Sequence, residues 1–90
     1  MERIEIHVHG KVQGVGYRAV TKHVAKKMGI VGFVQNRHDY VHVVAEGEKD
    51  ELMMLVNFCK KGPEFAEVEH VHFCFYPATK EFKEFSVKVT

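Results

Sequence analysis

The chain has 90 residues, 46% of them hydrophobic, which is enough for one small domain with a single core. Thirteen basic and twelve acidic residues give a formal net charge of +1, so neither nucleic acid nor a membrane is expected as a main partner. No signal-peptide pattern opens the chain and both cysteines lie in apolar patterns typical of reduced thiols, so we expect one cytoplasmic domain over residues 1–90.

The first half of the chain alternates between strand and helix patterns. Residues 3–9 place every second apolar side chain on one side, which predicts a half-buried strand. A glycine-rich loop follows, and residues 19–28 repeat apolar side chains at helical spacing up to Gly29. Residues 30–35 and 40–45 then predict a hairpin of two strands.

The second half predicts another helix and two more strands. Apolar residues between Leu52 and Cys59 line one face of a helix, which Gly47 precedes and Gly62-Pro63 closes. Residues 68–76 and 82–89 have strand patterns. The order predicts an α+β fold, a ferredoxin-like βαββαβ sandwich, with an antiparallel sheet, two helices on one face and an extra C-terminal strand.

This topology brings the glycine-rich loop close to Asn36. A right-handed crossover makes the first two strands parallel, with the second hairpin strand between them. Their C-terminal ends therefore share one edge of the sheet, about 10 Å apart. The loop leaves the first of these strands, and Asn36 ends the second.

The segment Gly10–Arg18 has the features of an anion-binding loop. Its glycines allow backbone N–H groups to turn inward, the following helix adds its positive end, and Arg18 adds a planar fork of donors. An arginine at a helix start is unfavourable unless an anion lies there. On this stretch alone, a flexible loop with a solvated arginine explains the residues equally well.

Residues that are missing exclude other phosphate-binding loops. Tyr17 and Arg18 follow the last glycine, where a nucleotide P-loop needs Lys and then Ser or Thr. Ala19 stands where a dinucleotide-binding loop needs a third glycine. Neither cysteine lies in the loop, so the chain has no nucleophile of the cysteine phosphatase type.

The loop resembles the signature of the acylphosphatase family, Gly-x-Val-Gln-Gly-Val-x-Phe/Tyr-Arg. Residues 29–36 resemble a second family segment, and Gly62-Pro63 with Ala66 and Val68 resembles a third. The resemblance implies a single acylphosphatase-like domain that hydrolyses acyl phosphates to carboxylate and phosphate without a metal or cofactor. Its implied partners are a small acyl phosphate and inorganic phosphate, the latter as product and competitive inhibitor. We expect a monomer.

The resemblance also implies which residues act. Arg18 binds the phosphate and Asn36 orients the attacking water, so these two are the catalytic candidates. The substrate-binding candidates supply backbone N–H groups and the guanidinium; they are Gln13, Gly14, Val15, Gly16, Tyr17 and Arg18. The hairpin departs from the family pattern, because Asp39 runs directly into Tyr40 as though a glycine were deleted. A shorter turn can shift Asn36 and lower activity.

Two other functions fit the predicted topology. A non-catalytic module that binds phosphate or carbamoyl phosphate, resembling the regulatory domain of hydrogenase-maturation carbamoyltransferases, would tolerate the shortened hairpin. An RNA-recognition domain shares the topology but needs exposed aromatic residues and a basic surface. His7 and His9 occupy the expected platform instead.

Seven histidines are many for a chain of this length. The strand patterns turn five of them toward the open face of the sheet; these are His7, His9, His42, His70 and His72. Such a cluster could bind a transition metal or titrate as a group. A solvated polar face is the simpler interpretation, because no cysteine or carboxylate spacing completes a metal site. The prediction is therefore that the chain has no metal site.

Overall fold

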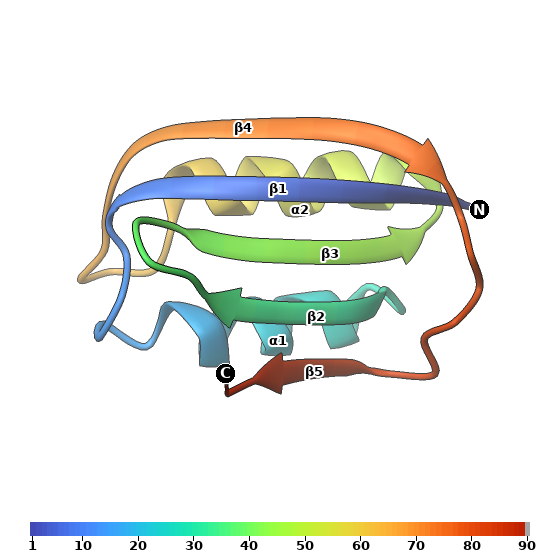
Figure 1. Ribbon diagram of the computed structural model, residues 1–90, viewed down its shortest axis with the longest axis horizontal. Coiled ribbons are helices and arrows are strands. Elements are labelled where there is room, and N and C mark those ends of the chain that lie inside the picture. Colours follow the sequence, from blue (N-terminus) through green and yellow to red (C-terminus); the bar gives the residue numbers. More distant parts are fainter. Residues whose placement is uncertain (90) are drawn as a thin grey trace.

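The computed structural model describes residues 1–89, which form one sheet and two helices (Figure 1). In chain order the elements are β1 (Glu2–Lys11), α1 (Tyr17–Lys27), β2 (Val31–Asn36), β3 (Val41–Gly47), α2 (Lys49–Lys61), β4 (Glu67–Pro77) and β5 (Phe85–Lys88). Both helices cover the same face of the sheet, and the other face is open (Figure 1). This is the predicted ferredoxin-like α+β fold. Among residues 1–89, no helix has the length and apolar character needed to cross a membrane.

The sheet has the strand order β4-β1-β3-β2-β5. Strand β3 pairs antiparallel with both β1 and β2, so β1 and β2 run in the same direction and end at the same edge, as predicted. The loop after β1 and the end of β2 meet there, at the left of Figure 1. The predicted juxtaposition of the glycine-rich loop with Asn36 therefore has its structural basis in β3.

Strands β1 to β4 form the predicted antiparallel sheet, and the predicted extra C-terminal strand, β5, makes the whole sheet mixed. Strand β5 pairs in parallel with β2, from Gly32 opposite Phe85 to Gln35 opposite Lys88. The chain crosses from the β4 edge to the β2 edge and reverses once on the way. Because β4 runs opposite to β2, a strand that follows one reversal has to run parallel to β2.

The core lies between the sheet and the helices. The alternating residues Ile4, Ile6 and Val8 are fully buried, as the strand pattern predicted. Cys59 on α2 is also buried, whereas Cys74 is exposed, so the prediction of an apolar environment is right for only one of the two free thiols. Cys74 alternates along β4 with phenylalanines that pack on the core, and it therefore points to the open face.

A buried carboxylate, Glu46, supports the end of the sheet opposite the glycine-rich loop. It has no exposed surface and accepts hydrogen bonds from the backbone N–H groups of Thr79 and Lys80, both at 2.9 Å. The Arg3 guanidinium lies 3.5 Å away. Burial alone would raise the pKa of Glu46, but these hydrogen bonds and the Arg3 charge lower it. Glu46 thus holds the segment that carries the chain from β4 to β5.

We predict that Glu46→Gln lowers the free energy of unfolding by about 1–3 kcal/mol, because an amide replaces a buried charged acceptor of several donors. Urea denaturation measures this loss. Since the pKa of Glu46 is lowered on folding, its contribution is present above the ordinary value of 4.5 and is lost as the pH falls below it. The difference between wild type and variant should therefore shrink on acidification. Glu64→Gln, at an exposed loop position, is the control and should leave stability unchanged.

Candidate active site

A small cavity lies at the sheet edge where β1 and β2 end. Its volume is about 190 Å³. It is lined by Val12, Gly14, Gly16, Arg18, Ala19, Asn36 and Val87. The loop after β1, the first turn of α1, the end of β2 and the C-terminal strand all contribute. Both predicted catalytic residues, Arg18 and Asn36, line this one cavity although 18 positions separate them in the sequence.

The loop that forms one wall depends on two glycines with positive φ. Gly14 has φ 76° and Gly16 has φ 78°, and a Cβ at either position would meet no atom of the described part of the chain within 4 Å. Glycine is therefore required by backbone conformation and not by space. Gly16 caps α1, which begins at Tyr17, two residues before the periodic pattern predicted.

The start of α1 carries unbalanced positive charge. The first N–H groups of a helix have no partner within the helix, and Gly16 offers no capping side chain. The first turn holds no acidic residue, whereas Arg18 stands half-buried within it. The helix dipole, the free N–H groups and the guanidinium all favour an anion at this end.

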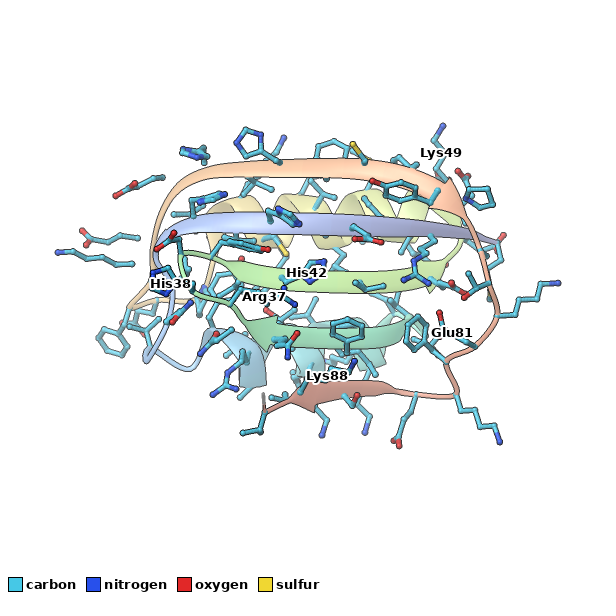
Figure 2. All side chains as sticks on the ribbon, in the orientation of Figure 1. Arg37, His38, His42, Lys49, Glu81 and Lys88 are labelled. Atoms are coloured by element: carbon cyan, nitrogen blue, oxygen red, sulfur yellow. The ribbon has the colours of Figure 1, made fainter. Side chains whose placement is uncertain are left out.

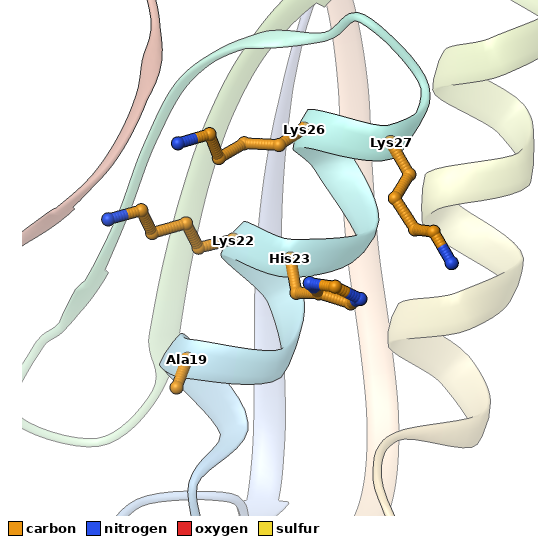
Figure 3. Close-up of a pocket in the computed structure, with 5 residues that line it drawn as sticks. All are labelled: Ala19, Lys22, His23, Lys26 and Lys27. Atoms are coloured by element: carbon orange, nitrogen blue, oxygen red, sulfur yellow. The ribbon is translucent and has the colours of Figure 1, made fainter.

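A basic surface adjoins the cavity along α1. A shallow hollow of about 450 Å³ is lined by Ala19, Lys22, His23, Lys26 and Lys27 (Figure 3). Lys22 and Lys26 extend in the same direction from the helix (Figure 3). Ala19 lines both this hollow and the cavity, so the two adjoin. The hollow has cations but no carboxamide, which makes it suited to attracting an anion and not to reacting with one.

Asn36 contributes an oxygen atom that has no partner. Its Oδ1 is buried and accepts no hydrogen bond from any residue between 1 and 89. Buried polar atoms are nearly always paired, so an unpaired one in a cavity wall indicates a ligand or water site. Asn36 is the last residue of β2 and pairs with Val41 across the hairpin. The shortened turn therefore leaves Asn36 in the sheet and in the cavity wall.

The side chain of Gln13 connects the glycine-rich loop to the hairpin. Its Nε2 donates to the carbonyl oxygens of Arg37 at 2.6 Å and Tyr40 at 3.1 Å, on either side of the turn. Neither residue between them, His38 or Asp39, has the positive φ that fits a two-residue hairpin to the strand twist. Gln13 compensates by holding both flanking carbonyls. The sequence predicted that the backbone N–H of Gln13 binds phosphate, but it gave no sign of this side-chain contact.

Other predicted binding residues turn their side chains away from the cavity. The Tyr17 ring is buried and its hydroxyl donates to the Cys59 carbonyl at 2.8 Å, which joins α1 to α2. Burial raises the pKa of Tyr17. The Val15 side chain packs against the core. The structure therefore groups Gly14, Gly16, Arg18 and Asn36 around the cavity, while Gln13, Val15 and Tyr17 stay outside its lining.

Sequence reasoning also missed three apolar lining residues. Val12 lies inside the signature and Ala19 directly follows it, but nothing in the sequence marked either as a cavity wall. Val87 comes from β5, and its position follows from the parallel pairing of β5 with β2. No local pattern in the sequence signals that pairing.

Comparison with known proteins decides the family. The family model described as Acylphosphatase matches residues 4–87. The chain belongs to the acylphosphatase family. It is 45% identical over 86 residues to an acylphosphatase of Marinobacter nauticus, with 94% of each chain covered. The solved structure of an acylphosphatase from Bacillus subtilis matches with a TM-score of 0.94 at 31% identity, covering 99% of this chain and 100% of that one.

These relatives also establish the activity. The chain is an acylphosphatase, a hydrolase of the carboxyl–phosphate bond of acyl phosphates. The structure of full-length HypF in a phosphate- and nucleotide-bound form matches with a TM-score of 0.90 at 25% identity. That match covers 98% of this chain but 12% of HypF. Membership among curated acylphosphatases disfavours the alternative of a non-catalytic binding module.

We predict that Gln13→Ala loosens the hairpin turn and lowers kcat by about 10- to 100-fold, because a displacement of about 1 Å at a reacting group can cost 100-fold. Hydrogen exchange of the backbone amides at residues 37–41 measures the loosening, and steady-state hydrolysis of benzoyl phosphate measures kcat. Asn57→Ala, at an exposed position on α2, is the control. Unchanged exchange in Gln13→Ala would show that the two hydrogen bonds do not hold the turn.

Proposed function

We propose that this acylphosphatase binds the phosphate end of its substrate in the cavity between the glycine-rich loop and Asn36. The guanidinium of Arg18 and backbone N–H groups from Gln13 to Tyr17 would hold the phosphate oxygens. The observation that supports this is the convergence of Arg18 and the unpartnered Asn36 Oδ1 on one cavity. An anion and a water molecule between them would satisfy both groups.

The reaction demands little acid–base chemistry from the protein. The leaving group is a carboxylate whose conjugate acid has a pKa of about 4–5, so it departs without a general acid. The phosphoryl group passes through a loose transition state in which negative charge spreads over its oxygens. Fixed donors that already point at those oxygens stabilise this charge. Arg18 and the loop N–H groups fit that role, and the proposed mechanism needs no metal ligand.

Asn36 would place the attacking water. Its Oδ1 is an acceptor and cannot donate, so a water bound there directs an O–H toward Asn36 and a lone pair toward the phosphorus. The carboxamide is not a strong base, and the substrate phosphate can take the proton that the water loses. Asn36 therefore contributes alignment, which is worth much in a reaction limited by positioning.

The cavity is sized for the phosphate end and not for a whole metabolite. Its volume of about 190 Å³ is below the roughly 300–1,000 Å³ of clefts that enclose drug-sized ligands. The acyl group would therefore lie outside, where few contacts discriminate. We infer that several acyl phosphates are accepted, and that inorganic phosphate, as product, competes for the same donors.

The remaining inferences concern the state of the protein in the cell. We infer one domain over residues 1–90, because a single core connects both helices to the sheet. The exposed large apolar side chains come from five separate segments of the chain, as on a monomer; they are Met1, Met54, Phe65, Tyr76 and Val89. Two free cysteines suit the reducing cytoplasm. A near-neutral net charge supports a small-molecule substrate and not nucleic acid.

We predict that Asn36→Ala lowers kcat for benzoyl phosphate by about 100-fold or more while the inhibition constant of inorganic phosphate stays nearly unchanged, because water alignment matters only along the reaction path. Arg18→Gln should weaken phosphate inhibition and lower kcat together. The matched controls are Asn57→Ala and Arg37→Gln, at exposed positions. Wild-type turnover in Asn36→Ala would refute its proposed role.

The basic hollow along α1 generates a further prediction. The double variant Lys22→Gln/Lys26→Gln should lower kcat/KM by about 2- to 10-fold at low ionic strength, because fewer cations attract the anionic substrate toward the cavity. The difference should vanish in high salt, where such attraction is screened. Lys49→Gln/Lys83→Gln removes the same charge at the other end of the sheet and is the control. Equal losses in both double variants would argue against steering by α1.

A further inference from the structure

Three histidines meet on the open face of the sheet, away from the helices. His9 lies on β1, and His70 and His72 lie on β4, the strand at the sheet edge. Each offers a ring nitrogen, and these three atoms all lie within 4.8 Å of one another. None of the three residues lines the acyl phosphate cavity. The cluster is therefore separate from the catalytic machinery.

We propose that His9, His70 and His72 form a binding site for a divalent transition metal ion such as Zn²⁺. Imidazole nitrogen suits zinc, copper and nickel, whereas magnesium and calcium prefer oxygen ligands. Three protein ligands with a fourth position open to solvent is an established zinc geometry. The hydrolysis proposed above makes no use of this ion.

The distances fit a metal with small side-chain adjustments. With Zn–N bonds of about 2.0–2.1 Å in a tetrahedron, two ligand nitrogens lie about 3.4 Å apart. The nitrogens of the cluster, within 4.8 Å of one another, therefore need to close by at most about 1.4 Å. His70 and His72 are exposed, so rotation of their rings meets little resistance.

Strand pairing between β1 and β4 places the three histidine rings next to one another. His70 and His72 are two residues apart on one strand and therefore share a face. His9 pairs directly with His70, and their ring centroids are 4.7 Å apart. The strand register shifts between His9 and Gly10, which marks a β-bulge. Bulges re-aim side chains, and this one lies beside the cluster.

The other two histidines on the open face, His7 and His42, contact side chains outside the proposed zinc site. His42, labelled in Figure 2, lies 3.3 Å from a Glu5 carboxylate oxygen and stands on the next strand. The His7 ring stacks on Tyr40 with centroids 4.4 Å apart. Among the described residues, no carboxylate forms an ion pair with His9, His70 or His72.

Metal binding would also join the edge strand to the rest of the sheet. Among residues 1–89, strand β4 pairs only with β1, and the proposed site spans that pair. An ion that binds the folded state in preference to the unfolded chain stabilises it by mass action. Thermal stability is therefore a second readout, independent of hydrolysis.

The test titrates the untagged full chain with ZnCl₂ in phosphate-free buffer, following the imidazole resonances by NMR and the stoichiometry by calorimetry. We expect one zinc ion per chain in the micromolar range, with broadening or shifts at His9, His70 and His72. Zinc should raise the Tm by about 5 °C or more. Magnesium should do neither.

Two double variants, each of which replaces two histidines, test where zinc binds. His9→Gln/His70→Gln should weaken zinc binding by at least about 10-fold, since the loss of even an outer partner of a metal ligand costs about 10- to 100-fold. His23→Gln/His38→Gln removes two exposed histidines elsewhere and should bind zinc as wild type does. Metal-free hydrolysis of benzoyl phosphate should be normal in His9→Gln/His70→Gln, which confirms folding and keeps this test apart from that of the catalytic roles.

Three outcomes would overturn the proposal. The first is no zinc binding in the micromolar range. The second is equal weakening in the two double variants, which would indicate diffuse binding to surface histidines. The third is a response to magnesium as large as the response to zinc. The single variant His72→Gln, at an exposed position, repeats the test if a double variant proves unstable.

Discussion

The pairing of β3 with both β1 and β2 is the constraint on which the proposed active site depends. It makes the outer two of these strands parallel and ends them at one edge, so the loop after β1 and the last residue of β2 share a cavity. Gln13 completes this arrangement, because its side chain ties the loop to the hairpin that carries Asn36. Positioning of this kind suits a reaction that needs aligned groups more than strong acids or bases.

The end of the sheet opposite the glycine-rich loop influences the cavity through the position of β5. Glu46 anchors the segment that leads from β4 across the sheet, and that segment delivers β5 to the edge of β2. Val87 of β5 then closes one side of the cavity. A buried carboxylate is costly unless its hydrogen-bonding capacity is filled, and here backbone donors fill it. The two ends of the sheet are thus linked through the C-terminal strand.

The two faces of the sheet serve different purposes. One face packs Ile4, Ile6 and Val8 against the helices and forms the core. The intervening positions carry histidines to the open face, where they are free of the packing demands of that core. Side chains alternate along β1, and along β4 from His70 onward, so a histidine cluster can lie on one face of the sheet while the other face forms the core.

Much of this protein could be predicted from the sequence by itself. Helical and alternating periodicities located the helices and strands of residues 1–89, and the glycine pattern with Arg18 located the loop that lines the cavity, because these signals reside in neighbouring residues. Topology rules then brought Asn36 to the loop.

The tertiary structure alone decided other features: the direction of β5, the side-chain role of Gln13, the exposure of Cys74, the burial of Glu46 and the meeting of three histidines. Each of these depends on the register or crossing of segments far apart in the chain. Local periodicity predicts which face of the sheet a residue occupies. Which residues it contacts there depends on long-range strand pairing, and the neighbouring sequence does not indicate that pairing.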